Sequence, residues 1–251
     1  WYVTLGGLSS CVMLVVSLFM LGHSLLGLEK SQVVFTTLTT RVEEERKRPK
    51  PTTTIELVTE DTHASSPYAV LKEENGNLFG WVKIAGTKLD YPVMYTPEEP
   101  EYYLHRAFDK SSSVSGVPFL DGNYIDGGKH YLIYGHNMKN GSMFASLHNF
   151  EDQQVFEENP YFYIYTEDKT YVYEIFAAYK YNAIHLIYNF DLTNPEIFQN
   201  YLDQIFEIRD MSANIRQDVT VNADNRIVTL STCVSGEKNM RYLVQGVLLN
   251  E

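Results

Sequence analysis

The sequence is poor in cysteine and in positive charge. Only Cys11 and Cys233 are cysteines among 251 residues, and 20 Lys and Arg against 32 Asp and Glu give a net charge of −12. A phosphate-binding surface needs a basic excess, so nucleic acid is excluded as a partner. There is no C-x-x-C or H-x-x-x-H pair, and no glycine-rich phosphate loop or dinucleotide fingerprint. We therefore predict no metal and no cofactor.

Charge is missing altogether from the first 28 residues, and Glu29 is the first charged side chain. Residues 5–28 are nearly all apolar or small, and as a helix these 24 residues would span roughly 36 Å, enough to cross a bilayer. No small-x-small cleavage site with a following break is evident, which favours a retained anchor over a cleaved signal peptide. The prediction is a transmembrane helix over 1–28, in a single-pass protein of the cell membrane whose remaining chain lies outside the cytoplasm.

Residues 29–68 are predicted to form a stalk. Thr and Ser are frequent, charges cluster over 43–50, and Pro49 and Pro51 interrupt any helix. A short helix can form over 43–48, but nothing in the segment demands a core. The composition changes at about residue 69, and residues 69–251 are long enough for one sizeable domain.

Short segments rich in Val, Ile, Tyr and Phe alternate in this domain with Gly, Pro, Asn and Asp, which is typical of β-strands. Two helices are predicted, a short one over 142–147 and a longer one over 195–211 that Asn194 caps. The pattern favours a mostly β protein, a closed or nearly closed β-barrel with peripheral helices. The predicted strands are 78–84, 89–94, 117–119, 131–134, 161–165, 170–183, 219–221, 226–232 and 241–249.

Cys233 follows an apolar strand directly and is the sole thiol of this domain. An exported, unpaired thiol is a liability unless it has a function, although a buried and inert cysteine is the alternative. Arg241 is expected to open the next strand after a loop of about seven residues, which would bring it back beside Cys233. A cation there would lower the pKa of a thiol and could stabilise an oxyanion, whereas a plain surface charge is the alternative.

His136 also stands at the end of an apolar strand, after Gly135. A thiol needs a proton acceptor to react near neutral pH, and histidine is the usual one. The other six of the seven histidines lack this strand-end setting, or are expected to face solvent or membrane.

Taken together, these residues resemble the sortase family. The resemblance rests on TLSTC at 229–233, YGHNM at 134–138 and the downstream Arg241, and it covers about residues 70–251. The long helix at 195–211 is similar to that of class B sortases. The resemblance implies an eight-stranded sortase-type β-barrel, in a Gram-positive bacterium.

The resemblance also implies a cysteine transpeptidase. Cys233 would form a thioester at a Thr-Gly-type bond of a sorting-signal peptide, His136 would act as acid and base, and Arg241 would hold the oxyanion. The implied acceptor is an amine of a peptidoglycan precursor or of a pilin lysine. Thr229 and Ser231 are expected to contact the substrate. Some class B members carry an acid just after the cysteine, whereas here Glu237 is the first. No lid motif appears in the stalk, which disfavours class C.

Two other functions stay open at this point. One is a non-catalytic, membrane-anchored β-domain that binds cell-wall polymer, in which Cys233 is inert. The other is a purely hydrolytic cysteine protease. Rapid labelling of the thiol near neutral pH would separate the first from an enzyme, and amine-dependent product would separate the second from a transpeptidase.

Overall fold

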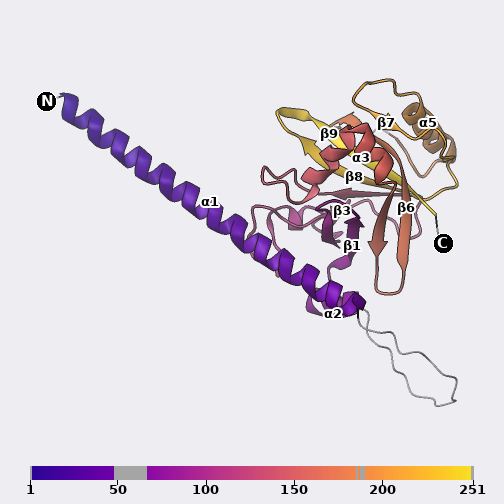
Figure 1. Ribbon diagram of the computed structural model, residues 1–251, viewed down its shortest axis with the longest axis horizontal. Helices are drawn as coiled ribbons and strands as arrows, with labels where there is room; N and C mark the ends of the chain where they lie inside the picture. The colour runs from indigo at the N-terminus through magenta and orange to yellow at the C-terminus, as the bar shows by residue number, and fades with distance from the viewer. Residues whose placement is uncertain (1, 48–66, 185, 187–189, 250–251) are drawn as a thin grey trace, which may run out of the picture.

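The computed structural model describes residues 2–47, 67–184, 186 and 190–249, and its centre is a β-barrel (Figure 1). The strands pair in the order β5-β1-β2-β3-β4-β8-β9-β6, and a β5–β6 pairing closes this circle of eight. The predicted eight-stranded barrel is confirmed, and the ninth strand, β7, pairs with β6 outside the circle. The strands are β1 (Leu78–Ile84), β2 (Asp90–Met94), β3 (Phe119–Leu120), β4 (His130–Tyr134), β5 (Tyr161–Tyr165), β6 (Thr170–Asn182), β7 (Asn214–Ile215), β8 (Ile227–Val234) and β9 (Glu237–Leu248).

Most strand boundaries lie within two residues of the predictions, but β3 shares only Phe119 with the predicted strand at 117–119, and two other regions differ more. β1 and β5 have the predicted bounds. β9 begins at Glu237 instead of Arg241, because Gly236 adopts a positive φ of 80° and the chain reverses within two residues. The predicted strand at 219–221 is wrong. Val221 is buried there without strand pairing, and β6 pairs with β7 instead.

The helices lie around the barrel. α5 (Pro195–Phe206) starts as predicted, since the Asn194 side chain accepts hydrogen bonds from the N–H groups of Glu196 and Ile197. It ends at Phe206 instead of 211, and its apolar face packs with Leu132 of β4 and Leu243 of β9 in a second hydrophobic cluster. The other helices are α1 (Tyr2–Lys47), α2 (Pro67–Glu74), η1 (Tyr102–His105), η2 (Phe144–Glu151) and α3 (Gln153–Glu158).

α1 is a single helix that projects from the barrel at its N-terminal end (Figure 1). The predicted anchor over 1–28 falls largely within it. Across the described residues, no helix combines the length and the apolar character that a membrane crossing requires.

The C-terminal part of α1 differs from the predicted stalk over 29–68. Residues 29–47 are helical, and Phe35, Leu38 and Val42 are buried in the main core, with Ser31 buried one turn earlier. These positions recur at intervals of four, three and four, so they form one face of the helix. The ring of Phe35 meets Tyr91 edge-on at 5.4 Å. Residues 48–66 of the predicted stalk lie outside the described part of the chain.

β8 runs between β4 and β9 and is covered on both faces. Val228 and Leu230 belong to the main core, whereas Ile227 belongs to the cluster beneath α5. Of the eight residues of β8, only Cys233 is exposed. A strand that is packed on both sides is rigid, so its one exposed side chain is presented from a fixed position.

Candidate active site

Cys233 is an exposed free thiol near the C-terminal end of β8. β8 pairs in parallel with β4 on one side and antiparallel with β9 on the other. The residues that reach Cys233 should therefore come from the end of β4 and from the β8–β9 hairpin.

Arg241 lies directly opposite Cys233 in the β8–β9 ladder. Side chains of such a pair have Cβ atoms about 4.5–5.5 Å apart and stand on the same face. Immediately after this pair the register shifts, so that Val234 pairs with Glu237 and residues 238–240 form a bulge opposite β8, while Met240 still pairs with Asn182 of β6. Nη1 of Arg241 donates to the bulge carbonyls of Lys238 and Met240, at 3.3 and 3.0 Å. The bulge thus orients the guanidinium through one of its nitrogens.

His136 follows the end of β4 and reaches the level of Cys233. In the parallel β4–β8 ladder Tyr134 pairs with Ser231. The contact continues beyond the ladder, because the N–H of Gly135 donates to the Ser231 carbonyl at 3.1 Å and the Thr232 hydroxyl donates to the Gly135 carbonyl at 2.8 Å. Continued by one residue, this register puts the backbone of His136 level with that of Cys233.

Gly135 is required by the close approach of η2. A Cβ at this position would lie 2.5 Å from Cγ of Phe144, which is fully buried. No real Cβ contact is that short, so only glycine lets the end of β4 and the start of η2 come together.

The His136 ring is oriented by η1. Its Nε2 lies 2.9 Å from the Leu104 carbonyl, and its ring stacks on His105 with centroids 5.6 Å apart. A carbonyl oxygen only accepts hydrogen bonds, so Nε2 carries the proton in this arrangement. In the neutral imidazole, Nδ1 is then the ring nitrogen without a proton.

Thr229 and Ser231 lie below the exposed end of β8. Thr229 has no exposed surface, and its hydroxyl contacts Nε2 of His130 at 2.8 Å and accepts from Gln245 at 2.7 Å. Ser231 is buried as well. Both side chains are thus enclosed by neighbours in this structure, and their predicted contact with the substrate stays a prediction.

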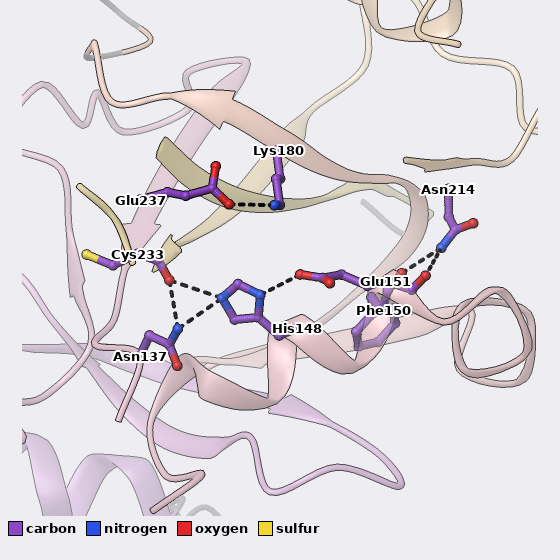
Figure 2. Close-up of polar contacts among 8 residues, drawn as sticks. All are labelled: Asn137, His148, Phe150, Glu151, Lys180, Asn214, Cys233 and Glu237. Atoms are coloured by element: carbon purple, nitrogen blue, oxygen red, sulfur yellow. Dashed lines mark hydrogen bonds and ion pairs between the residues drawn. The ribbon is translucent and has the colours of Figure 1, made fainter. Parts of the chain in front are cut away.

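Asn137 and His148 are the polar neighbours that the sequence analysis missed. Nδ2 of Asn137 donates to the Cys233 carbonyl at 2.9 Å, and Nε2 of His148 lies 3.0 Å from the same oxygen (Figure 2). The Cys233 sulfur points away from this cluster. Asn137 could have been predicted, because it is next to His136 in the sequence. His148 could not, because it reaches Cys233 only through the packing of η2.

The residues around His148 come from three elements. Its ring stacks on Tyr242 of β9 at 4.9 Å, and its Nδ1 lies 2.7 Å from a Glu151 carboxylate oxygen on η2. Burial, together with the Glu151 charge, raises the pKa of Tyr242 above its ordinary value, so this phenol stays neutral. Glu237, the first acid after Cys233, instead pairs with Lys180 of β6 at 2.8 Å.

Within the described part of the chain, neither a metal site nor a cavity competes with the site around Cys233. Within the described ranges, no three His, Cys, Asp or Glu side chains gather closely enough to hold a metal ion. A cavity of about 330 Å³ is lined by Tyr131 and Arg226, which lie at the starts of β4 and β8. It is therefore at the opposite ends of these strands from Cys233.

Comparison with known proteins identifies the family. The Sortase domain model matches residues 82–249. This chain belongs to the sortase family. Sortase B of Listeria monocytogenes is 31% identical over 188 residues, which cover 72% of this chain and 73% of that protein. Sortase B of Staphylococcus aureus is 28% identical over 173 residues, or 68% of this chain and 69% of that protein.

Solved structures agree with this membership. Clostridium perfringens sortase B is 31% identical, with 72% of this sortase and 98% of that chain covered at a TM-score of 0.63. Bacillus anthracis sortase B, at 24% identity, shares the fold over 89% of this chain and 98% of its own, with a TM-score of 0.72. A structure of Staphylococcus aureus sortase B with its substrate gives a TM-score of 0.71 at 23% identity, over 88% and 97% of the two chains.

The predicted family and class are confirmed. This sortase is a class B member and a cysteine transpeptidase that processes the sorting signals of surface proteins. The non-catalytic cell-wall-binding domain is excluded as its function.

Proposed function

We propose that Cys233, His136 and Arg241 carry out the transpeptidation. The Cys233 thiolate attacks the scissile carbonyl, and Arg241 bonds the oxyanion that develops there. His136 gives its Nδ1 proton to the leaving amine, and the C–N bond breaks to leave a thioester on Cys233. An acceptor amine then attacks the thioester and His136 takes its proton, so that a new amide forms and the thiolate leaves.

The observation that carries this proposal is the strand register around Cys233. Arg241 is its direct partner in the antiparallel ladder, and His136 stands two residues after Tyr134, the last residue of β4 that pairs with β8. These positions at one end of three adjacent strands support the three proposed roles. The three strands are packed in the core, which preorganises the site.

The proposed donor is a sorting-signal peptide cut at a Thr-Gly-type bond, and the proposed acceptor is an amine of a peptidoglycan precursor or of a pilin lysine. The substrate complex of Staphylococcus aureus sortase B supports peptide recognition by this fold. Thr229 and Ser231 are then supports of the β8 backbone beneath the substrate.

We also propose attachment to the cell membrane through residues 5–28, with the barrel on the extracytoplasmic side of a Gram-positive cell. The support is the sequence, because no charged side chain occurs before Glu29. Membrane fractionation of the full-length protein, compared with a variant that carries two added lysines within 5–28, tests this attachment.

The decisive test compares the two cysteines of the full chain. Cys233→Ala should abolish cleavage of a sorting-signal peptide, whereas Cys11→Ala should keep it, since only Cys233 lies in the site. Product should require an added amine. Cleavage by folded Cys233→Ala would refute the mechanism, and amine-independent product would indicate a hydrolase.

A further inference from the structure

The backbone carbonyl of Cys233 is held by two side chains at the point where the β8–β9 ladder shifts register. Asn137 and His148 approach this oxygen at 2.9 and 3.0 Å, while the thiol points the other way (Figure 2). A carbonyl oxygen has two lone pairs, so two donors satisfy it fully. The peptide plane that follows the nucleophile is therefore oriented by these side chains at the bulge.

The protonation of His148 decides whether it donates to this carbonyl. Nδ1 faces the Glu151 carboxylate at 2.7 Å, and an ionised carboxylate only accepts, so Nδ1 carries a proton. Nε2 faces the Cys233 carbonyl at 3.0 Å and the Asn137 amide nitrogen at 3.1 Å. With a second proton, Nε2 donates to the carbonyl. Without it, Nε2 can only accept from Asn137.

The imidazole is partly exposed and is held by residues of two elements. Tyr242 stacks beneath it from β9, and Glu151 backs it from η2. The end of η2 is itself tied down, because Asn214 of β7 donates to the carbonyls of Phe150 and Glu151 at 2.7 and 3.2 Å (Figure 2). The nearby charged pair is Lys180 with Glu237, which offset each other at 2.8 Å.

We propose that His148, backed by Glu151, is a positioning residue that orients the nucleophile through its backbone carbonyl. In its protonated form it locks the Cys233 peptide plane, and this holds the thiol in line with His136 and Arg241. His148 touches neither the thiol nor the substrate in this role. The inference rests on the proposed role of Cys233 as nucleophile.

The test uses the full chain with His148→Ala, His148→Gln and a matched control, Asn149→Ala. Asn149 is the next residue of η2, is exposed, and has no side-chain hydrogen bond to the described residues. We would measure kcat and KM on a sorting-signal peptide between about pH 5 and 9. Alkylation of Cys233 would be followed by peptide mass spectrometry, and melting temperature would report on folding.

His148→Ala should lower kcat by about 10-fold to 10²-fold with KM nearly unchanged, because a misplaced nucleophile slows the chemical step. It should also slow Cys233 alkylation. His148→Gln should restore most of both rates, since its amide N–H can reach the carbonyl. Asn149→Ala should match wild type.

Two results would overturn the proposal. One is wild-type kcat in a folded His148→Ala protein. The other is an equal loss in His148→Ala and His148→Gln with an equal fall in melting temperature, which means that the ring only packs. If no variant turns over peptide but alkylation still depends on His148 as described, the positioning role stands and the proposed transpeptidation fails.

Discussion

Cys233 and Arg241 are direct partners in the antiparallel β8–β9 ladder, on the last pair before the register shifts. The pairing fixes the two residues opposite each other on neighbouring strands of one hairpin, so the sheet itself holds the proposed nucleophile and its cation in place. The bulge carbonyls hold Nη1 of Arg241. In the proposed mechanism, the other guanidinium nitrogens bond the substrate oxygen.

Arg241→Lys should fail to rescue Arg241→Ala. Lysine keeps the charge, but its single nitrogen lacks the planar fork that lets arginine contact the bulge through one nitrogen and an oxyanion through another. Loss of one such donor typically lowers kcat by about 10²–10³-fold. Steady-state kinetics on peptide would show this, with circular dichroism as the fold control. A lysine variant with wild-type kcat would leave Arg241 only a point-charge role.

Gly135→Ala should destabilise the protein and slow catalysis. The new Cβ would meet the buried ring of Phe144 at 2.5 Å, and moving that ring displaces both η2 and the end of β4. Overpacking of this kind costs about 1–3 kcal/mol. Denaturant unfolding measures the loss. Gly76→Ala is the matched control, because a Cβ there meets nothing within 4 Å, and equal effects at both positions would contradict the argument.

Phe35→Ala should weaken the docking of α1 on the barrel. Phe35 is 4% exposed and packs edge-on against Tyr91. Removing a buried phenylalanine ring typically costs about 3–5 kcal/mol. Thermal unfolding of the full chain should show the loss, whereas Val33→Ala, at a position 61% exposed on the same helix, should leave stability nearly unchanged. Equal stability of the two variants would mean that α1 docks without Phe35.

Glu74→Gln should remove a pH-dependent contribution to stability. The hydrogen bond from Arg41 holds the pKa of Glu74 below its ordinary value. A lowered folded-state pKa stabilises above the unfolded-state pKa, and this contribution is lost as pH falls through the folded-state pKa. The pair is largely exposed, so solvent screening limits it to about 1 kcal/mol or less.

Unfolding curves at neutral and strongly acidic pH test the Glu74 prediction. The difference between wild type and Glu74→Gln should be present at neutral pH and absent in acid. Glu73→Gln serves as the control, since Glu73 forms no ion pair with a described residue. A difference that persists in acid would assign the effect to packing.

Most of the barrel could be predicted because its strands carry clear local signals. β1 and β5 are dense in apolar and aromatic residues between turn residues, and their bounds were predicted correctly. The start of β9 was missed because the polar residues before Arg241 look like a loop. They pair with β6 and β8 only because Gly236 permits a two-residue turn.

The sequence pointed to some residues of the candidate site and missed others. Cys233, His136 and Arg241 stand out by their places at strand ends, whereas His148 reaches Cys233 only once η2 has packed on β8 and β9. The docking face of α1 did leave a signal, since Phe35, Leu38 and Val42 recur at helical spacing among threonines. The surrounding Thr and Ser content hid that signal.

The docking of α1 sets how far the enzyme can reach. Ser31 already contacts Ser113 of the barrel domain at 3.0 Å, only three residues, or about 4.5 Å of helix rise, beyond Leu28. If residues 5–28 are embedded as proposed, α1 fixes the barrel directly to the membrane, so the barrel cannot move freely relative to its anchor. Its active site then works at one height above the lipid, and it meets donor and acceptor by lateral diffusion of the whole enzyme. Substrates must present the cleavable bond at that height.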